Sequence, residues 1–238
     1  MKTIVIMQPT YLPWIGYFDL MDQCDQFIFL DHVQFARRSW QQRNRIKTAH
    51  GEQMLTVPVL SKGLRDQSIR EVRIDSAKNF TVDHVKSIHS AYAKAPFYRR
   101  CADGLEEIFN RKHEFLCELN IQLIQWFAGV LGLHKECIRN SSLGVAGKKT
   151  QLLLSICRAL GATCYLSAVG SREYIEEENL FPGSGIELVY HQFHHPVYPQ
   201  LHGEFIPYLS ILDLVMNVGG SEALAVIRSG RMSGVRGV

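Results

Sequence analysis

Basic, amide and aromatic side chains crowd into the segment that follows the second expected strand. Arg43 could bind two oxygens of a phosphate or carboxylate through its planar guanidinium, and Lys47 adds a point charge. Asn44 could pair with the edge of a base or an amide, and Asp31 and Trp40 precede it in the same segment. This combination suits the diphosphate of an activated sugar. A solvated basic surface is the alternative interpretation.

A second candidate for anion binding precedes a helix in the later part of the chain. Residues 141–150 read SSLGVAGKKT, so free backbone N–H groups and Lys148 would converge at the N-terminus of that helix. The spacing of Gly144 and Gly147 does not match the phosphate loop G-x-x-x-x-G-K-[ST]. The segment therefore predicts a generic phosphate contact by Lys148 rather than a P-loop.

Polar groups near the C-terminus could act as bases or ligands. Four histidines gather there, but Pro196 and Pro199 argue against a helical H-x-x-x-H pair and no cysteine is nearby, so no metal site is predicted: His191, His194, His195 and His202. Asp213 could accept the proton of an amine nucleophile or could pair within the core. No G-x-S-x-G nucleophile elbow occurs, so serine hydrolase chemistry is not supported.

The elements that must position these residues follow from the hydrophobic pattern. Residues 3–7 and 26–30 predict strands and residues 14–24 a helix, which together make a βαβ unit with parallel strands. Residues 31–50 are expected to form an elaborated loop, and a hairpin with its turn at Gly63 follows it. The strands of the hairpin are predicted at 54–59 and 69–74, and further strands at 136–139, 162–167 and 186–190. Helices are predicted at 148–160, 171–179 and 207–218.

The alternation at both ends of the chain predicts a doubly wound, mainly parallel α/β sheet of the Rossmann or nucleotidyltransferase kind. We expect one domain over residues 1–228, with a helical insert of three segments at 79–133, a small β-hairpin elaboration and a flexible tail at 229–238. Ligands of such sheets bind outside the carboxyl ends of parallel strands, which singles out Gln8 and Ser167.

Composition limits the function classes. A hydrophobic fraction of 46% and a charged fraction of 21% are ordinary for a soluble globular protein, and a formal charge of +3 does not indicate a DNA-binding protein. The six cysteines lack a C-x-x-C pair, as expected of reduced thiols in a cytoplasm. No signal peptide or membrane span is predicted, so we expect a cytoplasmic location.

Four sequence strings resemble the WbqC-like family of bacterial proteins over residues 1–219. They are QPTYLPWIGYFDL, RRSWQQRNRIK, GKKTQLLLSICRALGATCYLS and HHPVYPQLHGEFIPYLSILDLVMNVG. The resemblance implies an association with gene clusters for O-antigen, lipopolysaccharide and other surface polysaccharides, and a suggested glycine-transferase role in modifying a sugar. It also makes His195, Tyr198 and Gln200, which stand in an H-P-x-Y-x-Q string, candidate site residues.

A weaker similarity connects the first string with nucleotidyltransferases of the H-x-G-H type, which hold triphosphate oxygens with two histidines. Here the four matching residues are Trp14, Ile15, Gly16 and Tyr17, so both histidines are replaced. Indole and phenol are poor proton donors at neutral pH, and adenylyl transfer from ATP through these positions is not expected. Tyr11, Trp14 and Tyr17 are interpreted as a stacking floor for a base or sugar ring, or else as core-facing residues.

Together these features predict a transferase of surface-polysaccharide synthesis. It would move an acyl or aminoacyl group, with glycyl among the candidates, from a thioester or an aminoacyl-tRNA to the amine of a nucleotide-linked amino sugar. Asp31, Asp213 and His195 are the catalytic candidates. The substrate-binding candidates are Gln8, Tyr11, Trp14, Tyr17, Trp40, Arg43, Asn44, Lys47, Lys148, Ser167, Tyr198 and Gln200.

Two alternatives stay open at this point. The first is a divergent nucleotidyltransferase that activates a small carboxylate with ATP, and the second is a nucleotide-sugar-binding protein without catalytic activity. No cofactor is predicted. The partners are the nucleotide-linked sugar and the activated donor, and assembly into a homo-oligomer is left open.

Overall fold

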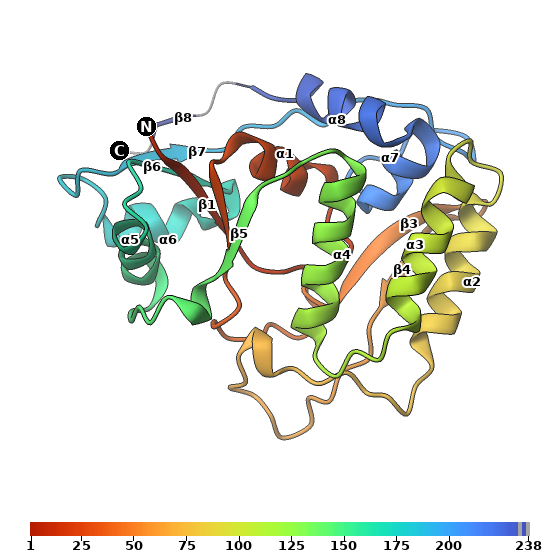
Figure 1. Ribbon diagram of the computed structural model, residues 1–238, viewed down its shortest axis with the longest axis horizontal. Helices are drawn as coiled ribbons and strands as arrows, with labels where there is room; N and C mark the ends of the chain where they lie inside the picture. The colour runs from red at the N-terminus through yellow and green to blue at the C-terminus, as the bar shows by residue number, and fades with distance from the viewer. Residues whose placement is uncertain (233–234, 237–238) are drawn as a thin grey trace.

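A six-stranded sheet forms the centre of the computed structural model, which describes residues 1–232 and 235–236 (Figure 1). In spatial order the strands are β5 (Glu136–Arg139), β2 (Gln26–Phe29), β1 (Thr3–Met7), β6 (Cys164–Ser167), β7 (Glu187–Tyr190) and β8 (Val235–Arg236). Strand β8 pairs antiparallel with β7, and the other neighbours are parallel. The chain winds outward from β1 first through β2 and β5 and then through β6 and β7. This order confirms the predicted doubly wound α/β class.

Helices cover both faces of the sheet because side chains of β1 alternate between two cores. Val5 belongs to the same hydrophobic cluster as Phe18 of α1 (Ile15–Gln23), and Ile4 and Ile6 belong to the cluster of Ile156 in α5 (Lys149–Ala159). Helix α6 (Arg172–Glu178) lies on the α5 side. Helices α4 (Leu116–Val130), α7 (Ile211–Val218) and α8 (Gly220–Ser229) lie on the α1 side (Figure 1).

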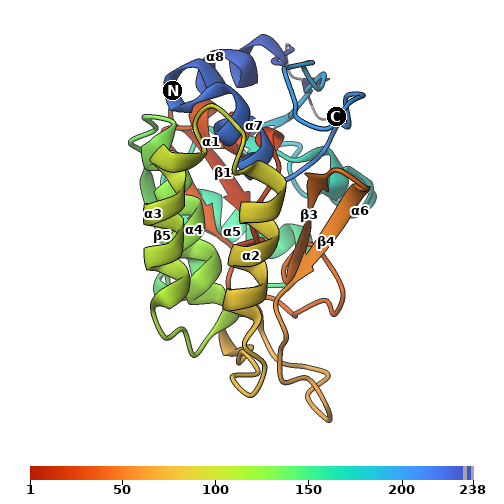
Figure 2. The same ribbon diagram turned by 90° about the vertical axis from the view of Figure 1, so that its right-hand side faces the viewer.

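The helical insert predicted for residues 79–133 is present as three helices. Helix α2 (Phe80–Tyr92) and α3 (Tyr98–Asn110) stand side by side, and α4 follows them (Figure 2). Three short 3₁₀ turns complete the helical elements: η1 (Ile69–Glu71), η2 (Asn140–Ser142) and η3 (Val169–Ser171). Within the described residues, no helix is both long and apolar enough to cross a membrane.

The predicted position of the hairpin was wrong. The hairpin consists of β3 (Arg43–Thr48) and β4 (Gly51–Thr56), so the basic segment is a strand and not a loop. Residues 69–71 form η1 instead of a strand, because the side chains of Ser68 and Glu71 cap each other's backbone N–H groups. Val59 and Ile74 still form an isolated bridge.

The last predicted helix begins four residues later than expected and is followed by a second one. Ser210 caps α7 by accepting a hydrogen bond from the Leu212 N–H, and Tyr208 has a left-handed φ of +59°, which is incompatible with a helix through Pro207. Helix α8 was not predicted. Within the predicted flexible tail, Arg231 bridges to Phe193 and β8 pairs with β7, while residues 233–234 and 237–238 lie outside the described residues.

Two arginines connect the C-terminal segment to α1 through Asp22. Arg228 lies at the end of α8, and Arg231 follows that helix. The carboxylate of Asp22 accepts hydrogen bonds from Arg228 at 2.8 and 2.9 Å and from Arg231 at 2.6 Å. The bond from Arg228 is the largest cause that lowers the pKa of Asp22 from 3.8 to about 2. Because this pKa is lower in the folded state, the contacts stabilise the fold above pH ~4 and are lost as the pH falls toward 2.

We therefore expect Asp22→Asn to lower the free energy of unfolding at pH 7 but to change it progressively less below pH ~4. Urea unfolding of both proteins between pH 7 and pH 2.5 measures the difference. The exposed Asp66 supplies a control, since Asp66→Asn removes a carboxylate that forms no described ion pair. A stability difference for Asp22→Asn that is constant over this pH range would contradict the assignment.

Candidate functional site

The turn after β1, which carries the first sequence motif, is held from outside by side-chain amides. Leu12 adopts a left-handed φ of +45°, and Asn44 Nδ2 donates to the carbonyl oxygens of Tyr11 at 3.2 Å and Leu12 at 2.7 Å. Asn120 Nδ2 donates to the carbonyl oxygen of Pro9 at 3.0 Å. Asn44 is buried, and both hydrogens of its amide group bind the turn. Its side chain therefore holds the turn in place and does not face a ligand.

Tyr17 is a core residue. Its side chain is 1% exposed, packs against Phe18 and Phe27, and donates its hydroxyl to the carbonyl oxygen of Gln8 at 3.2 Å. The geometry favours the core interpretation of this tyrosine over ligand stacking.

Trp14 lies over the first turn of α1. A Cβ atom on Gly16 would be 2.2 Å from Cη2 of the indole, so only glycine fits beneath the ring. The indole also packs edge-on against Phe193 at 5.5 Å and against Tyr208 at 5.4 Å. The indole thus fills the space beside Gly16 at the start of α1.

Lys47 is buried and holds an irregular segment of the chain. Its side chain points away from solvent, with 1% of its surface exposed, and Nζ donates to Gln200 Oε1 at 3.1 Å. It also donates to the carbonyl oxygens of Gly203 and Glu204 at 3.2 and 2.5 Å. The ammonium group has its three hydrogen bonds within the protein, so it fastens residues 200–204 to β3.

Asp213 and Tyr198 belong to the same buried cluster. Tyr92 donates its hydroxyl to Asp213 Oδ1 at 3.0 Å, and burial raises the pKa of Asp213. Burial likewise raises the pKa of Tyr198. The fold therefore brings Lys47, Tyr198, Gln200 and Asp213 together, with Gln200 half-buried and the other three side chains buried.

His195 is hydrogen-bonded at both ring nitrogens. Nε2 accepts the backbone N–H of Tyr208 at 3.0 Å, so the proton is on Nδ1, which donates to the carbonyl oxygen of Pro196 at 2.9 Å. Burial lowers the pKa of His195 and favours this neutral form. Since the lone pair of Nε2 is already used, the geometry does not favour a role as general base.

Two of the other histidines of this segment also contact protein groups. His191 Nε2 is 2.6 Å from Oδ2 of the fully buried Asp19, and His202 Nε2 is 2.7 Å from the carbonyl oxygen of Ala91. Across residues 1–232, no group of three or more His, Cys, Asp or Glu side chains is arranged to hold a metal ion.

Asp31 and Ser167 lie at carboxyl ends of strands, as predicted. Asp31 follows β2 and its carboxylate accepts the backbone N–H and the hydroxyl of Ser141 at 3.1 and 2.8 Å. It borders a cavity of about 460 Å³ that Arg70 and Arg139 also line. Ser167 is fully buried and its hydroxyl is 2.9 Å from that of Ser171.

At the N-terminus of α5 the predicted anion is supplied by the protein itself. Glu178 Oε2 accepts the backbone N–H of Thr150 at 3.1 Å, and Oε1 is 3.5 Å from Nζ of Lys149. Lys148 is exposed and lines none of the four cavities identified in the described part of the chain. A phosphate contact by Lys148 stays a prediction, in competition with this carboxylate.

The remaining predicted residues are not gathered in one place. Arg43 is half-buried, and its side chain forms no hydrogen bond or ion pair with the described residues. Trp40 is 51% exposed with the guanidinium of Arg45 5.6 Å from its ring centre. Gln8 Oε1 accepts a hydrogen bond from Gln41 at 2.7 Å.

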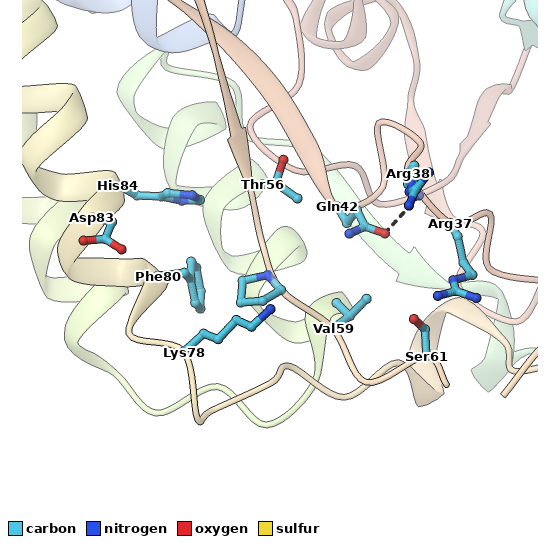
Figure 3. Close-up of a pocket in the computed structure, with 11 residues that line it drawn as sticks. Arg37, Arg38, Gln42, Thr56, Val59, Ser61, Lys78, Phe80, Asp83 and His84 are labelled. Atoms are coloured by element: carbon cyan, nitrogen blue, oxygen red, sulfur yellow. Dashed lines mark hydrogen bonds between the residues drawn. The ribbon is translucent and has the colours of Figure 1, made fainter. Parts of the chain in front are cut away.

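A basic cavity of about 470 Å³ lies between the start of α2, the loop before β3 and the segment after β4 (Figure 3). We call it the basic cavity and define it by Arg37, Arg38, Gln42, Lys78, Phe80 and Asp83, with further lining by Thr56, Pro58, Val59, Ser61 and His84. Its three cations are exposed, and none of them forms an ion pair with a described residue. Such a set attracts a phosphate-bearing ligand.

The start of α2 strengthens the positive character of the basic cavity. Asn79 is the N-cap residue but forms no capping hydrogen bond, so the first N–H groups of the helix lack the internal anion found at α5. Phe80 supplies an apolar ring beside Lys78. Asp83 is the one carboxylate among the described residues that line the cavity.

His84 closes the inner side of the basic cavity and joins it to the first motif. The hydroxyl of Tyr11 is 2.7 Å from His84 Nδ1, and burial lowers the pKa of His84 to about 4. His84 is therefore neutral at pH 7, and the fully buried Tyr11 contacts the cavity wall through it.

Sequence reasoning overlooked most of the residues of this cavity. Arg37 and Arg38 stand in the basic run that the sequence singles out, but the run gave no reason to prefer them over Arg43. Lys78 and Phe80 stand directly around the N-cap Asn79 of a predicted helix, which is a usable signal for an anion site.

The fold and the cavity define a doubly wound α/β protein with a basic cavity between a hairpin and a helical insert. The chain belongs to the WbqC-like protein family, whose model matches residues 8–224. It is 37% identical over 221 residues to the uncharacterized protein Rv1507c of Mycobacterium tuberculosis. The aligned residues make up 92% of this chain and 95% of the relative. No solved structure matches the chain.

Proposed function

We propose that the protein is a transferase of bacterial surface-polysaccharide synthesis. It binds a nucleotide-linked amino sugar in the basic cavity and passes an acyl or aminoacyl group, with glycyl among the candidates, to the sugar amine. The observation that carries this proposal is the presence of three cations without carboxylate partners around about 470 Å³. That volume is within the range of about 300–1,000 Å³ found for small-molecule sites.

The geometry changes the residues that we assign to the diphosphate. Arg37, Arg38 and Lys78 hold it, with Phe80 against a ring of the ligand. Lys47 is excluded from this role because its three hydrogen bonds are made inside the protein.

Asp83 is the group in the cavity that can assist the reaction. The amine nitrogen attacks the carbonyl carbon of the donor, a C–N bond forms, and the bond to the leaving oxygen or sulfur breaks. The amine proton goes to the Asp83 carboxylate and then to the leaving group, so no further reactant is needed. Asp31 and Asp213 are less suited, because their carboxylates are hydrogen-bonded to Ser141 and Tyr92.

The alternative of a divergent nucleotidyltransferase has less support. The indole of Trp14 fills the space beside Gly16, and Glu178 sits at the start of α5, so neither place predicted for a triphosphate is free. Binding of the nucleotide-linked sugar without turnover remains an outcome of the experiment below.

Calorimetric titration with UDP-N-acetylglucosamine and its free-amine analogue tests the site. The double variant Arg37→Gln/Lys78→Gln is expected to weaken binding at least about tenfold, because two charge-assisted contacts are lost. Arg43→Gln/Lys148→Gln removes the same charge outside the basic cavity and is expected to leave Kd within about twofold. Equal weakening by both pairs, or no binding to the wild type, would overturn the proposal.

Turnover separates the enzyme from a binding protein. Wild type is expected to acylate the free-amine sugar when supplied with an activated donor, and Asp83→Asn is expected to lower kcat with little change in Kd for the sugar. Tight binding without product from thioester or aminoacyl-tRNA donors would select the non-catalytic alternative.

A further inference from the structure

A second and larger cavity adjoins the basic cavity. It encloses about 1100 Å³ where α2 begins and α3 ends, and we call it the donor groove. Lys78 and Phe80 line both cavities, so the two spaces meet at these side chains. Figure 2 shows α2 and α3 side by side above the loops that surround this place.

The donor groove combines cations with exposed apolar side chains. Lys112 and Lys78 form no ion pair with a described residue, whereas Arg73 pairs with Glu114 at 2.9 Å. Leu60 is 46% exposed and Val82 is 41% exposed, so the groove offers apolar surface beside its lysines. A ligand that is only anionic would leave these apolar surfaces in water.

We propose that this groove binds the donor of the proposed transferase, a phosphopantetheine thioester. The phosphate contacts Lys112, and the pantetheine arm covers Leu60 and Val82. The thioester carbonyl then lies near Lys78 and Phe80, where the two cavities meet. This inference rests on the proposed function and names the donor class that the function requires.

The same lining argues against an aminoacyl-tRNA. A folded RNA requires a broad basic surface, whereas the chain has a formal charge of only +3. Two of the cations around the groove are already paired, Arg73 with Glu114 and Arg111 with Glu107. A short arm with one or a few phosphates matches the two unpaired lysines better.

The reaction balances without another co-reactant. The sugar amine attacks the thioester carbonyl carbon, the C–N bond forms and the C–S bond breaks. The thiolate leaves and takes up the proton released by the amine, so the products are an amide and a free thiol. Coenzyme A and a carrier protein present the same arm, and the experiment separates these two sources.

Binding of coenzyme A and of a holo-acyl carrier protein is measured by calorimetry, with UDP-N-acetylglucosamine titrated into the same samples. Lys112→Glu is expected to weaken binding of at least one thiol carrier about tenfold or more and to leave the sugar within about twofold. Lys94→Glu is the matched control, because Lys94 is exposed just after α2 and lines neither cavity. Arg37→Gln is expected to show the opposite selectivity.

Each outcome decides between the two proposals. If the sugar binds but neither carrier does, or if Lys94→Glu weakens carrier binding as much as Lys112→Glu, the donor groove is refuted and the basic cavity stands. If a carrier binds and the sugar does not, the acceptor site proposed in the basic cavity is refuted and the donor groove stands. Binding of an aminoacyl-tRNA that Lys112→Glu abolishes, with no binding of coenzyme A or carrier protein, replaces the thioester by the RNA-borne donor.

Discussion

Lys47→Met is expected to lower the free energy of unfolding by about 2–4 kcal/mol. The substitution removes the charged donor from the carbonyl oxygens of Gly203 and Glu204 and leaves Gln200 Oε1 with the backbone N–H of Ile206, at 2.9 Å, as its remaining donor. It also removes the positive charge that counteracts the burial of Asp213. Urea unfolding at pH 7 measures the loss, with the exposed Lys86→Met of α2 as a control that is expected to change stability by less than about 0.5 kcal/mol.

The same variant distinguishes a structural lysine from a substrate contact. If the role of Lys47 is structural, Lys47→Met lowers the stability of the protein and leaves the Kd of the folded fraction for UDP-N-acetylglucosamine unchanged. A variant that is as stable as the wild type and has lost sugar binding would contradict the buried role and restore the interpretation first made from the sequence.

Gly16→Ala is expected to cost about 1–3 kcal/mol, because the new methyl group would overlap the indole of Trp14. The ring has little freedom to move, since Phe193 and Tyr208 pack against it. In a double-mutant cycle, Trp14→Ala should relieve the overlap, so that Trp14→Ala/Gly16→Ala is more stable than the sum of the single changes predicts by at least about 1 kcal/mol.

Thermal or urea unfolding of the four proteins gives this coupling energy. Gly129→Ala in α4 is a suitable control, because a Cβ at that glycine meets no atom within 4 Å. Additive effects of the changes at 14 and 16 would show that the indole does not rest on Gly16, and the argument against a nucleotidyltransferase would lose its main support.

Much of the sheet could be predicted because its signals are local. The run from Thr3 to Met7 is apolar and ends before a proline, and Gly161 ends a helix just before another apolar run, so strands and helices alternate visibly. The three helices of the insert were visible for the same reason.

The hairpin was missed because two of the three buried side chains of β3 are polar. Asn44 and Lys47 are buried beside Ile46 by partners that come from distant segments, the carbonyl oxygens of the turn after β1 and the side chain of Gln200. A pattern of apolar residues shows such a strand poorly, because most of its buried side chains are an amide and an ammonium group. The sequence therefore suggested a loop.

The sequence could not predict where the basic cavity lies. It proposes one phosphate contact in the basic run and another at the N-terminus of α5, whereas the cavity combines Arg37 of that run with Lys78 at the start of α2, about forty residues along the chain. Only the packing of the insert against the hairpin brings them to one cavity. Lys47, Tyr198, Gln200 and Asp213, which the sequence proposes for substrate binding and proton transfer, lie together, and all of them except Gln200 are buried.

The two amide hydrogens of Asn44 restrict which side chains can replace it in this chain. An isosteric exchange to aspartate would put a negative oxygen against two carbonyl oxygens that now each receive a hydrogen, and the left-handed Leu12 would lose its restraint. Deamidation of this one side chain during ageing would have the same effect. This change would therefore loosen the turn after β1, although Tyr11 and Leu12 are buried there.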